Sequence, residues 1–225
     1  MARGFFITGT DTDVGKTTIA LGLMAAFKKA GMSVAAFKPV SAGCVQTENG
    51  LRNADALQLM QQASVEFPYE VVNPYVFEPA IAPHIAAAQQ NIEMNIETIV
   101  QAYHKIAAEA DVVIVEGAGG WLVPLNTTQT MADVACALGL DVIQVVGLKL
   151  GCLNHALLTS ASIATHQLKQ AGWIANQIID DMPKRLDNIY SLQLRLTDEY
   201  LGYIPNMSPL NPDEIAQHIN IDTLL

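Results

Sequence analysis

Short continuous apolar runs alternate along the chain with longer stretches whose apolar residues recur at helical spacing. An apolar run without polar alternation is typical of a strand that is buried on both faces of a sheet. The expected strands span residues 3–8, 34–38, 111–115, 142–147, 173–179 and 200–204. The expected helices span residues 16–30, 53–63, 85–90, 96–110, 131–138, 153–170, 185–196 and 212–219. This alternation predicts an α/β fold in which helices cover both faces of a mainly parallel β-sheet.

Two segments and one helix face depart from this regular pattern. Residues 41–51 are expected to form a polar loop, and residues 68–83 are expected to be irregular because they contain four prolines. The helix expected at 153–170 carries an apolar face that is most simply core, the alternative being contact with a partner subunit. That face consists of Leu157, Leu158, Ala161, Ile163 and Ala164.

The segment GTDTDVGKT, residues 9–17, joins the first expected strand to the first expected helix. A glycine-bounded loop followed by Lys-Thr at a helix start is typical of a P-loop, in which backbone N–H groups and the helix dipole hold phosphates. Here five residues separate Gly9 from Gly15, whereas the usual P-loop has four. Lys16 is expected to reach the outer phosphates of a nucleotide, and the Thr17 hydroxyl is expected to bind Mg²⁺.

Polar or special residues stand at or just after the carboxyl ends of five expected strands. Ligands bind at the carboxyl ends of the strands in parallel sheets of this kind, so these residues are expected to converge on one site. They are Gly9, Lys38, Glu116, Lys149 and Asn176.

Three charged residues each have an ordinary alternative role. Glu116 ends an apolar strand where P-loop proteins place a carboxylate for Mg²⁺, and the alternative is that it caps a loop. Lys38 is expected to point into the cleft, and the alternative is that it extends into solvent. Asp55 either caps the start of the helix at 53–63 or joins the metal shell. The glycines that follow Glu116 allow a second loop to approach the phosphates or the substrate.

Composition limits the possible classes of function. The 225 residues are 51% hydrophobic, which suits one P-loop α/β domain spanning residues 1–225 with a substantial core. A net charge of −10 argues against general nucleic-acid binding. No apolar run approaches the roughly 20 residues of a membrane span. Three scattered cysteines and a strand close to the N-terminus predict a reduced cytoplasmic protein without a signal peptide.

Eight motifs, in order and spread over essentially the whole chain, resemble those of the dethiobiotin synthetase family. They are GTDTDVGKT (9–17), KPV (38–40), LRNADAL (51–57), NPY (73–75), PH (83–84), VEGAGG (115–120), KLGCLNH (149–155) and AGWIAN (171–176). The five-residue spacing within the P-loop is a trait of that family. The resemblance therefore implies a P-loop NTPase-like fold.

The resemblance also implies a reaction, the penultimate step of biotin biosynthesis. The diamine 7,8-diaminononanoate would take up CO₂ as a carbamate, and ATP would phosphorylate the carbamate to a carbamic-phosphoric anhydride. The neighbouring amine would then displace phosphate and close the cyclic urea of dethiobiotin, leaving ADP. ATP and Mg²⁺ would be the cofactors of this C–N bond-forming ligase. Phosphoryl transfer of this kind depends mostly on positioning and charge neutralisation.

By the same resemblance, Lys38 and Lys16 would be catalytic, and Thr17, Asp55 and Glu116 would form the metal shell. The nucleotide would contact Asp13, Val14, Gly15, Lys16, Thr17, Thr18, Asp55, Glu116, Gly117, Ala118, Gly119, Asn176, Gln177, Pro205, Asn206, Met207 and, with weaker support, Asp213. The substrate would contact Lys38, Ser41, Gly151, Cys152, Leu153, Asn154 and Tyr190. The family is a homodimer whose substrate site spans both subunits, so the last five residues would come from the partner.

The sequence departs from the family's pattern at one position, and it lacks features of two other families. The family usually carries Lys-Pro-Val-x-Ser-Gly, whereas Ser41 here directly follows Val40, so its contact with the substrate is a hypothesis. Cobyrinate diamide synthetases usually carry an additional glutaminase domain, for which no room remains here. Partition-type ATPases carry a second lysine near the start of the P-loop, at the position that Asp11 occupies in this chain.

Overall fold

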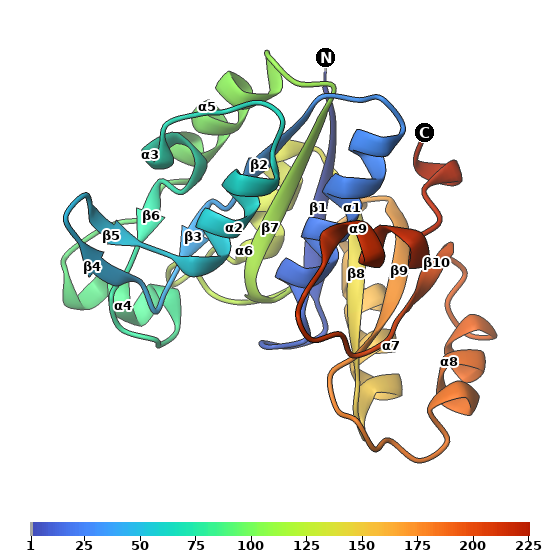
Figure 1. Cartoon of the computed structure of the whole chain (residues 1–225). Coiled ribbons are helices and arrows are strands. Elements are labelled where there is room, and N and C mark those ends of the chain that lie inside the picture. Colours follow the sequence, from blue (N-terminus) through green and yellow to red (C-terminus); the bar gives the residue numbers. More distant parts are fainter. Residues whose placement is uncertain (1) are drawn as a thin grey trace.

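A six-stranded sheet forms the centre of the computed structural model, which describes residues 2–225 (Figure 1). All of its strands run parallel, in the order β10-β9-β8-β1-β7-β2. The strands are β1 (Arg3–Gly9), β2 (Val34–Phe37), β7 (Val112–Gly120), β8 (Asp141–Leu148), β9 (Gln170–Gln177) and β10 (Tyr200–Ile204). The expected α/β fold with a parallel sheet is confirmed.

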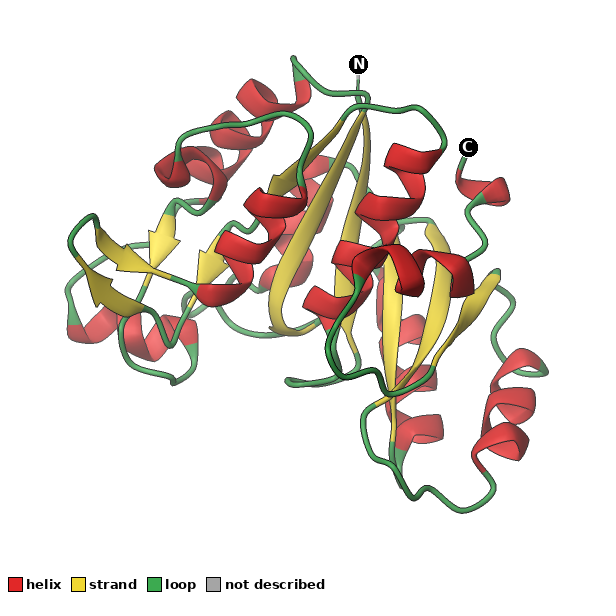
Figure 2. Ribbon diagram, viewed as in Figure 1, coloured by secondary structure: helices red, strands yellow, loops and turns green. Residues whose placement is uncertain are grey.

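Helices cover both faces of this sheet, as expected (Figure 2). Alternate side chains of a strand point to opposite faces, so Phe5 and Ile7 of β1 enter one core while Phe6 enters the other. The helices are α1 (Lys16–Lys29), α2 (Ala54–Gln62), α3 (Tyr69–Val72), α4 (Pro83–Gln89), α5 (Ile96–Ala107), α6 (Met131–Leu138), α7 (Cys152–Thr165), α8 (Arg185–Gln193) and α9 (Pro212–Ile215). Within residues 2–225, no helix is long and apolar enough to cross a membrane.

The chain leaves the sheet after β2 and forms what we call the 38–90 segment, at the left of Figure 1. The expected polar loop at 41–51 is wrong, because β4 (Val45–Thr47) and β5 (Gly50–Arg52) pair as an antiparallel hairpin. The turn contains Asn49-Gly50, and Gly50 has φ +92°, a geometry that favours glycine in tight hairpins. The expected irregularity at 68–83 is also wrong in part, since α3 lies there and β3 (Val40–Ser41) pairs with β6 (Tyr75–Val76).

Several element ends differ from the expected ones. The strand expected to stop before Glu116 continues through Gly120, because it stays paired with β1. The helix expected at 153–170 ends at Thr165, and Gln170 already belongs to β9, where it pairs with Val142. The helix expected at 212–219 ends at Ile215 and continues as a 3-10 turn, Ala216–His218.

The apolar face of α7 is largely solvent-facing in the single chain. Ile163 is buried, but Leu158, Ala161 and Ala164 are exposed, so their interpretation as core is wrong. A helix whose apolar residues extend beyond its buried stripe leaves a surface available for another molecule.

Candidate active site

A cavity of about 940 Å³ opens at the carboxyl ends of β1, β2 and β7. It is lined by residues of the P-loop, by the end of β7 and by the 38–90 segment. Of the residues proposed from sequence, the lining includes Asp13, Gly15, Lys16, Thr17, Thr18, Lys38, Ser41, Asp55, Glu116, Gly117, Ala118 and Gly119. The strand ends thus bring three distant parts of the chain to one site, as expected for ligand sites at the carboxyl ends of parallel strands.

The P-loop holds its shape through backbone conformations that few residues tolerate. Gly15, the N-cap of α1, has φ +86°, and a Cβ at this position would lie 2.1 Å from Nδ2 of Asn176. That Nδ2 donates to the backbone oxygen of Val14 at 2.8 Å, so the end of β9 braces the loop. The Val14 side chain is buried in the core, which leaves only its backbone for a nucleotide. The first N–H groups of α1 have no intrahelical acceptor and suit a phosphate.

Lys16 extends along this loop and is largely buried. Its Nζ donates to the backbone oxygen of Asp11 at 3.4 Å. Burial lowers the pKa of Lys16, and the nearby carboxylate of Glu116 opposes that change. An anion placed beside Nζ would compensate for the water that the ammonium group has lost.

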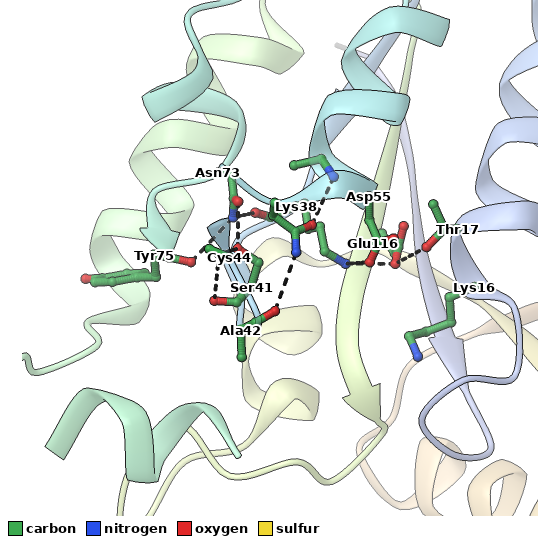
Figure 3. Close-up of polar contacts among 12 residues, drawn as sticks. Lys16, Thr17, Lys38, Ser41, Ala42, Cys44, Asp55, Asn73, Tyr75 and Glu116 are labelled. Carbon is green, nitrogen blue, oxygen red and sulfur yellow. Dashed lines mark hydrogen bonds and ion pairs between the residues drawn. The ribbon is translucent and has the colours of Figure 1, made fainter. Parts of the chain in front are cut away.

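Glu116 is the centre of a charged cluster between the P-loop and the 38–90 segment (Figure 3). It is 1% exposed, and its Oε1 accepts hydrogen bonds from Lys38 Nζ at 2.8 Å and from Thr17 Oγ1 at 3.0 Å. The Asp55 carboxylate lies 3.7 Å from Lys38 Nζ on the other side. Among the described residues, none hydrogen-bonds the second oxygen of Glu116, Oε2.

Burial and hydrogen bonds bear on the alternatives for these charged residues. Lys38 is 4% exposed and points into the cluster, so the solvent alternative is wrong. The side chain of Asn53 caps α2 by accepting from the Ala56 N–H, which leaves the Asp55 carboxylate beside Lys38. Glu116 binds side chains of two other segments, and this is not the pattern of a loop cap.

The donor set fits Mg²⁺ better than a transition metal. Residues 2–225 contain no group of three His, Cys, Asp or Glu side chains placed to hold a metal ion. Two carboxylates, one of which has an oxygen without a hydrogen-bond partner, and one hydroxyl match an ion that takes few protein ligands and completes its shell with phosphates and water.

Ser41 is buried at the rim of the cavity. Its Oγ donates to Oδ1 of Asn73 at 2.7 Å and lies 3.2 Å from the Cys44 sulfur. With its proton engaged by Asn73, the hydroxyl presents acceptor capacity to a ligand.

The residues of β9 and of the stretch after β10 that were proposed to contact the nucleotide do not line the cavity of the single chain. Asn176 lies behind the P-loop. Gln177 Oε1 accepts from Tyr203 OH, and its Nε2 donates to the backbone oxygens of Ile179 and Asp180. Asn206 donates to the Asp180 carboxylate and follows Pro205 just after β10, with Met207 next along the chain.

Asp213 lies apart from this group. Its carboxylate pairs with Lys29 in the last turn of α1, at 3.3 Å, whereas the P-loop is at the first turn. The structure therefore does not bring Asp213 into the cavity.

The five residues proposed to contact the substrate of a partner subunit form a separate group. Gly151, with φ +94°, starts α7, where Cys152 is buried, Leu153 is half-buried and Asn154 is exposed. Tyr190 is on α8 and is 62% exposed. None of the five lines the cavity of the same chain, so a contribution from them to this site would require a second subunit.

Sequence reasoning missed three features of the site. Asn73 stood out only as part of a motif, although it links Lys38 and Ser41. Lys149 was expected at the site but does not line the cavity, and its pairing with the P-loop was not foreseen: Nζ lies 2.7 Å from the Asp11 carboxylate, and this bond lowers the pKa of Asp11. Apolar residues of the 80–83 stretch, together with Val123 and Pro124, also line the cavity. The PH motif was the only sequence signal for that wall.

Comparisons with known proteins agree with this arrangement. A family model described as an AAA domain matches residues 3–214. The ATP-dependent dethiobiotin synthetase BioD of Cellvibrio japonicus (strain Ueda107) is 47% identical over 223 residues, covering 99% of this chain and 98% of its own. The enzyme of the same name from Aeromonas salmonicida (strain A449) is 44% identical over 227 residues, with both chains covered completely.

Among solved structures, the MinC:MinD cell division protein complex of Aquifex aeolicus contains a chain with a TM-score of 0.57 and 19% identity. The match covers 98% of this chain and 88% of that chain. This likeness shows the P-loop NTPase fold, whereas the two full-length relatives show the family. The chain belongs to the ATP-dependent dethiobiotin synthetase family.

Proposed function

We propose that this protein is an ATP-dependent dethiobiotin synthetase that converts 7,8-diaminononanoate and CO₂ to dethiobiotin in biotin biosynthesis. The observation that carries the proposal is the Lys38–Glu116–Thr17 cluster beside a P-loop, in a chain 47% identical to a dethiobiotin synthetase over its full length. The reaction uses ATP to phosphorylate a substrate carbamate, and the second amine displaces phosphate to close the ring.

ATP would lie with its phosphates along the P-loop. The free N–H groups at the start of α1 and the ammonium of Lys16 supply positive charge where the phosphates end. Their value lies in preorganisation, because groups already fixed in place need not reorient as charge moves during phosphoryl transfer. The buried Val14 and the brace from Asn176 keep this loop rigid.

We infer that Thr17, Asp55 and Glu116 hold Mg²⁺. The unsatisfied Oε2 of Glu116 supports this assignment, since a buried carboxylate oxygen without a partner is costly. When bound, the ion would neutralise charge on the phosphate oxygens. The assignment rests on the three side chains and the orphaned oxygen.

Lys38 Nζ lies 2.8 Å from Glu116 and 3.7 Å from Asp55, the two carboxylates proposed to bind the metal. Its ammonium group is well placed to hold the carbamate and to neutralise charge on the phosphoryl group as it transfers. The apolar wall formed by residues 80–83 and Val123 suits the aliphatic part of the diamine.

Ser41 is proposed to accept a hydrogen bond from a substrate amine, because its own proton is engaged by Asn73. Ser41→Ala is expected to raise the KM for the diamine while the affinity for ATP stays unchanged. Steady-state kinetics with each substrate varied in turn check this, and unchanged kinetics would remove Ser41 from the site.

The active form is proposed to be a homodimer in which Gly151, Cys152, Leu153, Asn154 and Tyr190 of one subunit complete the site of the other. Large apolar side chains on the α7–α8 surface support this: Leu150, Leu158, Leu186, Tyr190 and Leu194 are all exposed in the single chain. An exposed group of this kind is typical of an interface. A carboxylate at the start of α7 would meet the positive end of the helix dipole.

The direct test incubates the purified protein with ATP, Mg²⁺, bicarbonate and 7,8-diaminononanoate and detects dethiobiotin by mass spectrometry. Formation of dethiobiotin, with one ADP released per molecule, is expected. Reactions without the diamine or without bicarbonate serve as controls and are expected to release little ADP. An absence of product with intact ATP binding would overturn the proposed function.

A further inference from the structure

Asn73 lies at the centre of a buried hydrogen-bond network beside the cavity (Figure 3). It is 2% exposed, directly after α3. Its Nδ2 donates to the backbone oxygen of Lys38 at 2.6 Å. Its Oδ1 accepts from Ser41 Oγ at 2.7 Å and from Tyr69 OH at 2.9 Å. The amide thus connects two proposed substrate contacts through one side chain.

The bond to Lys38 falls where the sheet stops supporting the backbone. Strand β2 ends at Phe37, whose partner is Val115, and Pro39 has no N–H to donate. The N–H of Lys38 donates to the backbone oxygen of Val72 at 2.9 Å, and its C=O accepts from Asn73. Both polar backbone groups of Lys38 are therefore held by residues 72–73 and not by a strand.

A second branch reaches the opposite side of the cluster. The Tyr69 hydroxyl, which donates to Asn73, accepts the backbone N–H of Asn53 at 2.7 Å. Asn53 caps α2, whose first turn carries Asp55. Removing the amide of Asn73 would therefore loosen supports of Lys38 and of the helix end that carries Asp55.

We propose that Asn73 is a positioning residue that aligns Lys38 and Ser41 for the transfer of the phosphoryl group to the carbamate. The reaction step that Asn73 serves rests on the proposed function, whereas its role in alignment rests on the hydrogen-bond network alone. Asn73 acts through Lys38 and contacts no reacting atom. The ammonium group of Lys38 is at the end of a flexible four-carbon side chain, so a small shift of the backbone moves this group away from Glu116.

The first test is the kinetics of Asn73→Ala in two backgrounds. In the otherwise native protein, kcat is expected to fall about 10- to 100-fold, with ATP affinity changed less than about threefold. In a Lys38→Ala background, the same substitution is expected to cost less than about threefold further, because the group that it aligns is gone. An equal loss in both backgrounds, or an unchanged kcat in the native background, overturns the proposal.

Asn73→Asp supplies a second variant that keeps the shape and the two acceptor contacts. The new carboxylate cannot donate to the Lys38 oxygen, whereas its protonated form can. The kcat of this variant relative to the native protein is therefore expected to rise as the pH falls. A relative kcat that does not change with pH contradicts the role assigned to the Lys38 contact.

Asn95→Ala is the matched control, because the Asn95 side chain caps α5 and lies outside the cavity lining. It is expected to lower Tm by about 2–4 °C and to leave kcat unchanged. Crystal structures of the native and Asn73→Ala proteins give a readout independent of turnover. Lys38 Nζ is expected to move out of hydrogen-bond distance of Glu116 in the variant. An unmoved Lys38 would overturn the positioning role of Asn73, whether or not the protein makes dethiobiotin.

Discussion

The Glu116 carboxylate and the Lys38 ammonium depend on each other, because both are almost completely withdrawn from water. A buried charge that loses its partner is destabilising by several kcal/mol, typically about 3–5. Such a pair is costly to keep in a core, and its position beside a P-loop supports the catalytic role that we propose for Lys38. The charge on either residue is expected to matter more for turnover than for the fold of distant elements.

Lys38→Ala is expected to keep ATP binding and to lose most of the turnover, with kcat reduced by about 100-fold or more. The P-loop contacts remain, whereas the charge opposite the transferred phosphoryl group is lost. Calorimetric titration with ATP and product assays measure the two effects separately. Lys169→Ala is the control, since that exposed lysine forms a 3.0 Å ion pair with Asp141 away from the cavity. A Lys38→Ala enzyme with native kcat would exclude the proposed role.

The lowered pKa of Lys16 leads to a prediction about pH. Phosphates beside the ammonium favour its charged form, so the pKa of Lys16 should rise when ATP binds. Binding at alkaline pH therefore takes up a proton, and ATP affinity falls as the pH rises through the pKa of Lys16 in the free enzyme. Calorimetry in two buffers of different ionisation enthalpy measures the proton uptake. Proton release, or an affinity that increases over this range, would contradict the prediction.

At the scale of elements, two glycines with positive φ should respond differently to the same change. Gly15→Ala places a methyl group against Asn176, and the P-loop must shift. This variant is expected to lose ATP binding. Gly139 is the αL C-cap of α6 with φ +63°, and a methyl group added there would meet no atom within 4 Å, so Gly139→Ala should cost only about 1 kcal/mol of stability. Thermal unfolding and ATP titration of both proteins distinguish a local clash from general backbone strain.

The strands of the central sheet were predictable because each contains a buried apolar segment, and the shared edge of their carboxyl ends brought Lys38, Glu116 and the P-loop together. The β4–β5 hairpin was not predicted, because Val45–Thr47 is exposed and lacks a hydrophobic pattern. Its only local signal was Asn49-Gly50. The role of Asn73 was hidden for a different reason, since the two site residues that it holds, Ser41 and Lys38, lie 32 and 35 residues away in sequence.

At the scale of the whole molecule, the α7–α8 surface is the feature that the single chain leaves unexplained. Leu158 is 61% exposed on a helix whose opposite side is packed against the sheet. Burying a leucine of this kind contributes about 1.5–3 kcal/mol, so a few such residues are enough to favour association.

Leu158→Asp is expected to shift the proposed homodimer to monomer, because a charge in a buried apolar interface is costly. Light scattering coupled to size exclusion measures the mass, and the KM for the diamine should rise with dissociation while ATP affinity is retained. Val45→Asp changes a similarly exposed residue on the β4–β5 hairpin and should leave the mass unchanged. A dimer that survives Leu158→Asp would place the interface elsewhere.

The sheet and the 38–90 segment contribute different residues to the cavity. The P-loop, α1 and Glu116 come from the nucleotide-binding framework, whereas Lys38, Ser41, Asp55 and Asn73 all lie within one continuous excursion of the chain. Four of the proposed site residues thus come from one segment outside the central sheet, in the way that functional sites are added to a common fold. For protein engineering, the consequence is that replacing this one segment would exchange four of the proposed site residues at once, while the P-loop and Glu116 stay unchanged.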